Sequence, residues 1–538
     1  MKKYFALLVA ISFIFILAVG CGDPEDIDTE APDQEAETEE VEDKQVVMGI
    51  NPEYNTFDPA HAYEKSATMI MKVLYDNLVT FEGEDTVTPR PMVAESWEIS
   101  EDNKTYTFDL QEGIEFTTGN TLTAEDVKWS FERARDLKGN PSFLAENIKE
   151  IETPDDYQVV ITLHEVDPSF LSKLTQSVFG ILDSQVVQEQ GGTQDDETDD
   201  AKSWLDNHSA GSGSYILDKF VPNDELILVK NDDHWATQPE IDRVVFRHVS
   251  EPSTQMMMLQ KGDIDFAFDL DSEQIEMLKG DENVEILNSN TFSIFWFHMN
   301  MDPEIGGPVS EPKVQQAIRY ALDYDGLTDL AGNDAFTPYS IMPVGFLGAL
   351  DPEDGIEQDV EKAKQLLEEA GYPDGFEIET GVIPGMAPDG VSFMTMAEKI
   401  QADLAQVNIT MNISQEEVSI YLEKYRSGEH QTNVSMWGPD FPDALNQLAF
   451  LPGQTVGLRA NWTEEMNPEL AELGHQARTE VDDEARKELL EEIQRQVLET
   501  GPYAVFVQPV RALAHSNDLT HVLYTPAFQL DILTLDRQ

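Results

Sequence analysis

The residues of this chain that could carry out catalysis do not occur in the arrangements that common reactions require. Its 538 residues include ten scattered histidines and a single cysteine, with no His-Glu-x-x-His motif. No Gly-Lys dipeptide occurs, so a Walker phosphate loop is absent, and Gly211-Ser212-Gly213-Ser214 does not fit the Gly-x-Ser-x-Gly pattern of a nucleophile elbow. A hydrolase with paired carboxylates stays open as a minor alternative. These absences give no positive sign of an enzyme, and we expect no cofactor and no metal.

The charge balance excludes other classes of function. Acidic residues outnumber basic ones by 104 to 34, a formal net charge of −70. Binding to nucleic acid or to anionic lipid requires a basic face, so neither is expected. One cysteine excludes an internal disulfide framework and a cysteine-based zinc module.

The N-terminus predicts export. Met1-Lys2-Lys3 is followed by an almost wholly apolar run from Tyr4 to Gly20, which suits an export signal better than a membrane span. Its end, Leu17-Ala18-Val19-Gly20-Cys21, resembles a bacterial lipoprotein signal. We therefore predict a signal peptide over residues 1–20 and a lipid on Cys21, which would anchor the protein to the extracytoplasmic face of the cell membrane. An ordinary secretory signal is the alternative.

A tether and an acidic body are expected after the anchor. Residues 21–43 contain twelve acidic and no basic residues, a composition that predicts an extended, disordered segment. Without the signal's two lysines and these twelve acids, the rest of the chain still carries −60. Because molar salt shortens electrostatic screening to about 3 Å, we predict adaptation to high salt. The alternative is a solubility adaptation that requires no salt.

The remainder of the chain mixes strands and helices, which predicts an α/β fold in more than one lobe. Thr105–Leu110 and Tyr157–Leu163 alternate apolar and polar residues, as half-buried strands do. Thr123 and Asp126 form a predicted capping box that begins a helix. We further expect a helix between Asp359 and Gly371, a helix over Glu484–Leu498, and a surface loop over Gln188–Asp200.

Several segments, in order along the chain, together resemble the family 5 extracellular solute-binding proteins, which are the peptide and nickel receptors of bacterial ABC importers. Their number and order carry the resemblance, and Ala94–Val127 is the strongest region. The segments are Phe57–Ala60, Leu74–Leu78, Ala94–Ser100, Tyr106–Phe116, Leu122–Val127, Gly211–Tyr215, Leu259–Asp265, Val314–Asp323, Ala363–Phe376 and Trp437–Asp443.

The resemblance implies a periplasmic-binding-protein-like fold with a two-lobed cleft and an additional inserted domain, three lobes in all. A ligand would be trapped by hinge closure between lobe III and the other two. Lobe I would comprise residues 44–82, 208–290 and 503–538; lobe II residues 83–207; and lobe III residues 291–502.

The Trp437–Asp443 segment supplies the first implied ligand-binding residues. In peptide-binding members of the family, the matching aspartate pairs with the ligand's α-amino group, which implies this role for Asp440; the alternative is that Asp440 caps the following turn. Trp437 would wall the cleft or lie in the core. Gly438 would let the ligand backbone approach, or is a plain turn glycine.

The same resemblance implies further cleft residues. Tyr63 and Lys65 would meet the ligand, Lys65 through a carboxylate, although a solvated loop is the alternative. Phe143 and Trp296 could also reach the cleft, and for both the alternative is burial in the core. His298 is interpreted as a structural histidine rather than a metal ligand.

The arginine that holds the ligand's carboxylate in short-peptide receptors is not identified, and Arg459 and Arg426 are candidates by location only. The ligand's identity therefore stays open. We expect a monomer that captures a dipeptide or oligopeptide and delivers it to an ABC permease with its ATPase subunits. The alternatives are a non-peptide solute (a nickel chelate, an oligosaccharide or an opine) and a receptor that senses a peptide.

Overall fold

The computed structural model describes residues 44–538 except residues 53 and 333. The predicted signal peptide, Cys21 and the tether lie outside the described residues. Within the described part of the chain, no helix is both long and apolar enough to cross a membrane.

The first large sheet is built from segments far apart in the sequence. Strand β1 lies in its interior and pairs in parallel with β10 on one side and β11 on the other. The strand order is β12-β18-β11-β1-β10-β9-β8. The bounds are β1 Gln45–Ile50, β8 Tyr215–Val221, β9 Glu225–Lys230, β10 Arg243–His248, β11 Phe266–Ala267, β12 Val284–Asn290 and β18 Val510–Ser516, with helices α1 Lys65–Leu74, α5 Lys202–Leu205, α6 Pro252–Lys261 and α7 Ser272–Leu278.

The second sheet is antiparallel and packs on helix α2. Thr123 and Asp126 form the predicted capping box at the start of α2, and Val127, Phe131 and Ala134 are buried against the sheet's core. The strand order is β4-β5-β7-β6. The bounds are β4 Ala94–Ile99, β5 Thr105–Leu110, β6 Ile148–Asp155, β7 Gln158–Leu163, α2 Ala124–Asp136, α3 Phe170–Lys173, α4 Ser184–Glu189, η1 Asn140–Leu144 and η2 Ser177–Phe179.

The third sheet is mixed and lies among the longer helices, in the order β15-β14-β16-β13-β17. The predicted helix after Asp359 is α11, and the Asp359 side chain accepts a hydrogen bond from the backbone N–H of Lys362. The bounds are β13 Ile294–Met299, β14 Phe376–Val382, β15 Ile409–Gln415, β16 Thr432–Trp437, β17 Tyr503–Val507, α8 Pro303–Gly306, α9 Pro312–Ala321, α10 Tyr324–Ala331, α11 Val360–Glu369, α12 Phe393–Ala405, α13 Val418–Ser427, α14 Thr455–Arg459, α15 Pro468–Thr479 and α16 Asp483–Thr500.

Smaller elements complete the described chain. Three two-stranded ribbons join β2 to β3, β19 to β22 and β20 to β21. Their bounds are β2 Val79–Glu82, β3 Asp85–Pro91, β19 Leu519–Thr520, β20 Tyr524–Thr525, β21 Gln529–Leu530 and β22 Asp536–Arg537, and the remaining short helices are η3 Gly307–Ser310, η4 Pro352–Asp354, η5 Pro388–Gly390, η6 Ala444–Phe450, η7 Glu464–Met466 and η8 Ile532–Thr534.

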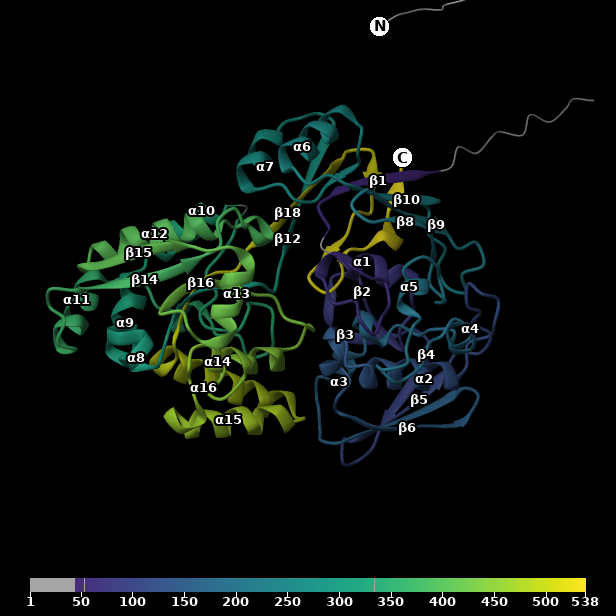
Figure 1. Ribbon diagram of the computed structural model, residues 1–538, viewed down its shortest axis with the longest axis horizontal. Coiled ribbons are helices and arrows are strands. Elements are labelled where there is room, and N and C mark those ends of the chain that lie inside the picture. The colour runs from purple at the N-terminus through teal and green to yellow at the C-terminus, as the bar shows by residue number, and fades with distance from the viewer. Residues whose placement is uncertain (1–43, 53, 333) are drawn as a thin grey trace, which may run out of the picture. The chain divides into compact units, whose positions relative to one another are not determined.

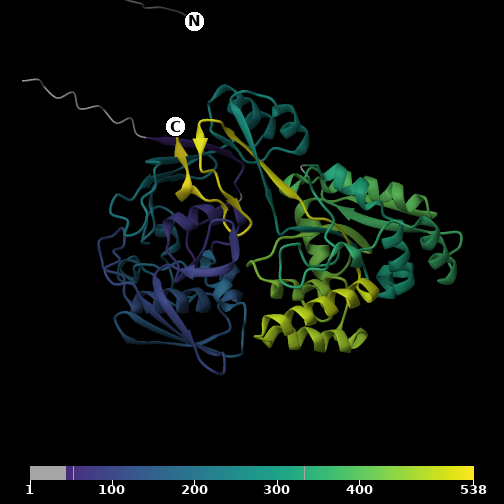
Figure 2. The ribbon, with the colours of Figure 1, turned by 180° about the vertical axis from the view of Figure 1, so that it is seen from behind.

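Two adjacent connections join the seven-stranded sheet to the five-stranded sheet. Strands β12 and β18 pair along their length, and both lead out of the first sheet, as Figures 1 and 2 show from opposite sides. Residues 291–293 and 508–509 then connect them to β13 and β17, which pair in the other sheet. The side chain of Gln508 donates to the carbonyl of Thr291 (2.7 Å), and Thr291 donates to the carbonyl of Pro509 (2.8 Å). The two connections are therefore tied together.

Two of the predicted lobe boundaries fall at paired strands. The resemblance implies lobe I for residues from 503 onward, whereas β17 pairs with β13 in the five-stranded sheet, and the chain returns to the seven-stranded sheet only at β18. The predicted boundary between residues 82 and 83 falls inside the β2–β3 hairpin. Backbone pairing keeps each of these strands with its partner, and local sequence does not reveal that pairing.

Candidate functional site

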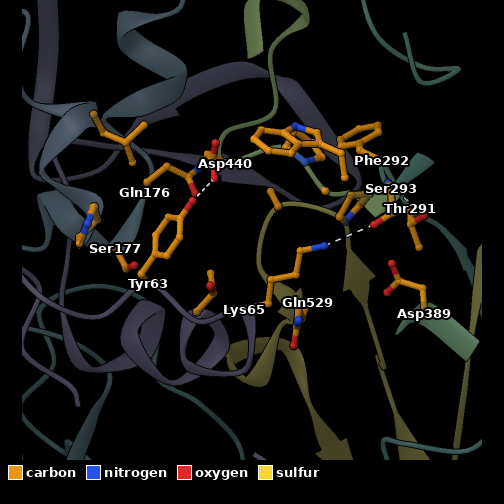
Figure 3. Close-up of a pocket in the computed structure, with 18 of the residues that line it drawn as sticks. Tyr63, Lys65, Gln176, Ser177, Thr291, Phe292, Ser293, Asp389, Asp440 and Gln529 are labelled. Carbon is orange, nitrogen blue, oxygen red and sulfur yellow. Dashed lines mark hydrogen bonds between the residues drawn. The ribbon is translucent and has the colours of Figure 1, made fainter. Parts of the chain in front are cut away.

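A pocket of about 330 Å³ gathers residues from segments far apart in the chain. Figure 3 shows Tyr63 and Lys65 reaching into it from the start of α1 and Asp440 facing them from the segment after β16. Residues 291–293 of one inter-sheet connection also line it, so the pocket adjoins the pair of connections. The lining residues are Ala62, Tyr63, Lys65, Thr68, Pro141, Leu144, Gln176, Ser177, Val178, Thr291, Phe292, Ser293, Asp389, Met436, Trp437, Gly438, Pro439, Asp440, Tyr524, Pro526, Ala527 and Gln529.

Asp440 presents a carboxylate to this pocket. The Tyr63 hydroxyl donates to its Oδ1 at 2.5 Å, and the Asn446 side-chain amide donates to its Oδ2 at 3.3 Å. Burial raises the pKa of Asp440 above its ordinary value, although the two hydrogen bonds and the charges of Lys65 and Arg459 oppose the shift. No basic side chain of the described residues lies within ion-pair distance of Asp440. Both neighbours that bond it are neutral, so a ligand cation would find a carboxylate without a direct counter-ion.

The surroundings of Asp440 are fixed by hydrogen bonds. The Trp437 indole N–H donates to the Asn446 side-chain oxygen at 2.8 Å, which leaves the Asn446 amide directed at Asp440. Asp443, not Asp440, caps the following turn of helix, because its side chain accepts from the backbone N–H of Leu445. The capping alternative for Asp440 is therefore not what the structure shows.

Lys65 occupies the space that Gly438 leaves open. A Cβ built on Gly438 would lie 2.2 Å from the Lys65 ammonium and 2.8 Å from its Cε. The ammonium donates to the Ser293 hydroxyl at 3.3 Å, as Figure 3 shows. The predicted close approach at Gly438 is thus used by a lysine of this chain, which crosses the pocket from α1.

Asp389 is a pocket residue that sequence reasoning missed. It lies in η5 with a positive φ of 50°, and its Oδ1 is 3.5 Å from Nη1 of Arg511. Burial raises its pKa, but the positive charges of Lys65 and Arg511 outweigh that effect and hold the pKa of Asp389 below its usual value. The only local signal was the turn sequence Pro388-Asp389-Gly390, which occurs equally at turns without function.

Two predicted cleft residues have other positions. Trp296 is fully buried in β13, with its ring edge-on to Phe450 and Tyr503, which agrees with the alternative of burial in the core. Phe143 is 42% exposed and does not line the pocket, but its ring packs edge-on against Tyr63 at 6.1 Å. Phe143 therefore supports a pocket residue instead of forming the wall.

The candidate arginines and His298 also lie away from the pocket wall. The guanidinium of Arg459 stacks over the rings of Tyr425 and Trp437, and Arg426 is exposed on α13. His298 is fully buried, and burial lowers its pKa to about 3, so its imidazole is neutral in the core. Neither arginine lines the pocket, and Lys65 is its only lysine or arginine among the described residues.

One cluster could offer ligand atoms to a metal ion. Potential ligand atoms of Asp58, His61 and Asp199 lie within 4.8 Å of one another. However, the buried Arg133 guanidinium already binds both carboxylates, at 2.6 and 2.7 Å to Asp58 and at 3.0 and 2.8 Å to Asp199. A metal would compete with that ion-pair network, so we assign the cluster to structure. The bonds between Arg133 and Asp199 also tie the predicted surface loop Gln188–Asp200 to α2.

Comparison of the chain with known protein families identifies the family to which it belongs. Residues 88–457 match the model of the bacterial extracellular solute-binding proteins, family 5 (middle region). The chain belongs to this family. The predicted resemblance is confirmed, and so is the α/β fold of the periplasmic binding proteins.

Individual relatives differ in the solute that their names give. The chain is 29% identical over 426 residues to the dipeptide-binding protein of Escherichia coli, covering 75% of this chain and 76% of that one. It is also 29% identical over 445 residues to heme-binding protein A of Haemophilus influenzae, covering 78% and 79% of the two chains. A dipeptide-binding protein from a Pseudoalteromonas species, solved with Met-Leu, has a TM-score of 0.77 at 22% identity, over 92% of this chain and 100% of that one. At that identity the likeness shows the fold alone.

Proposed function

We propose that this protein captures a short peptide by its α-amino group and passes it to an ABC importer. The observation that carries the proposal is the half-buried carboxylate of Asp440, which faces the pocket with a phenol and an amide as its hydrogen-bond donors. Even partial burial of a carboxylate without a counter-ion has a cost, and a peptide ammonium would supply both the opposite charge and the hydrogen bonds. The dipeptide-binding relative in E. coli supports this choice.

Lys65 is the proposed partner of the peptide's carboxylate. It is the pocket's only lysine or arginine among the described residues, and its ammonium rests against Gly438 in the same segment as Asp440. Asp389 partly balances the positive charge of Lys65, because that charge lowers the pKa of Asp389 and so favours its ionised form. A volume of about 330 Å³ is near the lower end for ligand pockets, which favours a peptide of two or three residues.

Three lobes are proposed to enclose the ligand. Lobe II would contain the four-stranded sheet, lobe I the seven-stranded sheet and lobe III the five-stranded sheet, with closure at residues 291–293 and 508–509. The location of the pocket beside these connections supports this mechanism, because hinge rotation there would change the pocket's width. The protein would act as a receptor and not as an enzyme, and a monomer is sufficient because the described residues of one chain form the whole pocket.

Anchoring through lipid on Cys21 completes the proposal, and the signal-like residues 1–20 support it. Labelled palmitate should be incorporated in bacteria that express the wild-type chain and not in those that express the Cys21→Ala variant. Equal labelling of both variants would contradict lipidation at this residue.

The function is tested by measuring the melting temperature of the purified protein in molar salt with pooled peptides of two to eight residues. A ligand at a hundred times its dissociation constant should stabilise the fold by about 2.7 kcal/mol. The same pools with acetylated N-termini should give little shift. No shift with any free peptide, together with a shift from a nickel chelate, an oligosaccharide, an opine or heme, would replace the peptide with that solute. Uptake of a labelled peptide by a strain that lacks the gene for this protein then distinguishes import from sensing. Loss of uptake indicates import, and unchanged uptake indicates sensing.

A further inference from the structure

Phe441 is a buried aromatic residue that the proposed peptide site does not use. It directly follows Asp440 in the segment after β16, yet it does not line the pocket. Its side chain packs in the hydrophobic cluster of the four-stranded sheet, and only 7% of its surface is exposed. All other buried members of that cluster lie between Leu78 and Ile181. Phe441 is therefore a residue of the proposed lobe III that is buried in the core of the proposed lobe II.

Charged groups surround this contact. The ammonium of Lys173, on α3, lies over the Phe441 ring at 5.0 Å from its centroid, an attractive arrangement. Lys173 also pairs with Asp167 at 2.6 Å. Burial lowers the pKa of Arg478 on α15, and the charge of Asp167 opposes that shift. Side chains of α3 and of the turn before it thus meet two separate segments of the proposed lobe III.

The cluster that receives Phe441 also reaches the peptide pocket. Leu144 and Val178 belong to this cluster, and both line the pocket. Phe441 and Asp440 are adjacent, and a proline on each side of the pair restricts the backbone. Movement of Phe441 into the cluster therefore carries the Asp440 carboxylate toward the pocket wall that Leu144 and Val178 form.

The energies of these two movements are opposed when no cation is present. Burial of the Phe441 ring is favourable, because it removes apolar surface from water. Enclosure of the Asp440 carboxylate is unfavourable, and burial accordingly raises its pKa. A ligand ammonium beside Asp440 would remove that cost, so that the gain from Phe441 favours closure. The amine and the aromatic contact would then stabilise each other.

We propose that Phe441 is a positioning residue that docks lobe III on lobe II when an amine binds Asp440. This inference rests on the proposed peptide function and deepens it. It assigns part of the affinity for the peptide to a side chain that the peptide does not touch, and it identifies the contact that closes the pocket on the side of lobe II.

The first test measures whether a bound dipeptide buries position 441. Cys21 is the only cysteine, so the double variant Cys21→Ala, Phe441→Cys carries a single thiol. A dipeptide that raises the melting temperature of the wild-type protein, added at a concentration that saturates this variant, should slow the reaction of the thiol with a maleimide about tenfold or more. In the control Cys21→Ala, Val418→Cys, whose site on α13 is 47% exposed, the rate should stay the same.

Two results of this experiment would overturn the proposal. A slow reaction both with and without the dipeptide would show that Phe441 belongs permanently to the core of lobe II. A fast reaction in both conditions would show that Phe441 does not dock. Failure of the proposed function is a different result, because in that case no dipeptide raises the melting temperature of the wild-type protein.

The second test is calorimetry of the Phe441→Ala variant with the same dipeptide, which should bind about 10-fold to 100-fold more weakly. Phe441→Leu keeps an apolar side chain and should lose about threefold or less. Tyr157→Ala is the matched control, since it removes an aromatic ring that packs against the same cluster but lies outside the pocket; it should bind as the wild-type protein does. Wild-type affinity in a folded Phe441→Ala variant would contradict the proposal. If that variant does not fold, the maleimide experiment decides alone.

Discussion

Replacing Asp440 with asparagine tests the peptide site most directly. Asparagine keeps the size of the side chain and can still accept the hydrogen bond from Tyr63, which is 2.5 Å long in the native protein. The change therefore removes the negative charge and little else. The described residues place no cation at ion-pair distance from Asp440. A loss of binding free energy in this variant therefore reports the interaction of Asp440 with the ligand's ammonium.

The size of the effect follows from the partial burial of Asp440, which a bound ligand would complete. Removing one partner of a buried, hydrogen-bonded charge pair costs about 2–5 kcal/mol of binding energy. Since about 1.4 kcal/mol corresponds to a factor of ten, we expect the Asp440→Asn variant to bind a dipeptide about 30-fold to 4,000-fold more weakly. The loss for the N-acetylated dipeptide should be far smaller, because that ligand has no ammonium.

Isothermal titration calorimetry of both variants with both ligands gives the coupling between the carboxylate and the amine. Asp443→Asn is a matched control: Asp443 lies three residues away and its pKa is also raised by burial, but it caps a helix and does not line the pocket. The control should bind the dipeptide as the wild-type protein does. If Asp440→Asn binds the free dipeptide as tightly as the wild-type protein while remaining folded, the amine is held elsewhere and the reasoning fails.

Four further outcomes are expected. Burial raises the pKa of Asp440, so the folded state holds this proton more tightly than the unfolded state does. The carboxylate therefore destabilises the ligand-free protein as pH rises above about 4. The Asp440→Asn variant should have a higher melting temperature than the wild-type protein at pH 7 and not at pH 3.5, and an equal rise at both pH values would contradict the assignment. Lys65→Met should weaken a free dipeptide about tenfold and its C-terminal amide hardly at all, and equal losses would remove the carboxylate role. Gly438→Ala would displace the Lys65 ammonium and should lower the affinity for the dipeptide with little loss of stability. In the double variant Lys65→Met and Gly438→Ala, the affinity should be no lower than in Lys65→Met alone. A further loss of affinity would show that Gly438 acts independently of Lys65. Finally, with a net charge of −70, the protein should unfold at a lower urea concentration in dilute buffer than in molar sodium gluconate, and identical midpoints would leave only solubility to explain the acidity.

Local sequence predicted the elements whose stability is local. The capping box of α2 and the Asp359 cap of α11 form within one turn of backbone, and the structure contains both. The strand Thr105–Leu110 has the predicted bounds because its two faces differ in burial, which produces alternation in the sequence.

Strand β13 shows where that reasoning stops. All six of its residues are buried, so no alternation distinguishes the face toward the pocket from the face toward the core. The sequence therefore leaves Trp296 between the cleft and the core, and the structure buries it. Phe143 lies neither in the core nor on the pocket wall, and an aromatic residue after a proline turn gives no signal of which neighbour it meets.

The pocket itself is a product of tertiary structure. Tyr63 and Asp440 are 377 residues apart in the chain and share a hydrogen bond, and Lys65 fills the space beside Gly438 that was assigned to a ligand. Family resemblance indicated several of these positions, but their contacts depend on how the sheets pack. Asp389 was missed because its role comes from Lys65 and Arg511, which reach it from distant segments.

The sequence by itself determined the acidity, the apolar N-terminal run before Cys21, the missing catalytic motifs and the family, because each of these is a property of composition or of short ordered segments. Only the tertiary structure decided which charges are paired. Arg133 and Arg319 look alike in the sequence, yet one meets two carboxylates and the other meets two backbone carbonyls. The energy of a buried charge depends on its neighbours within a few ångströms, and folding brings those neighbours from anywhere in the chain.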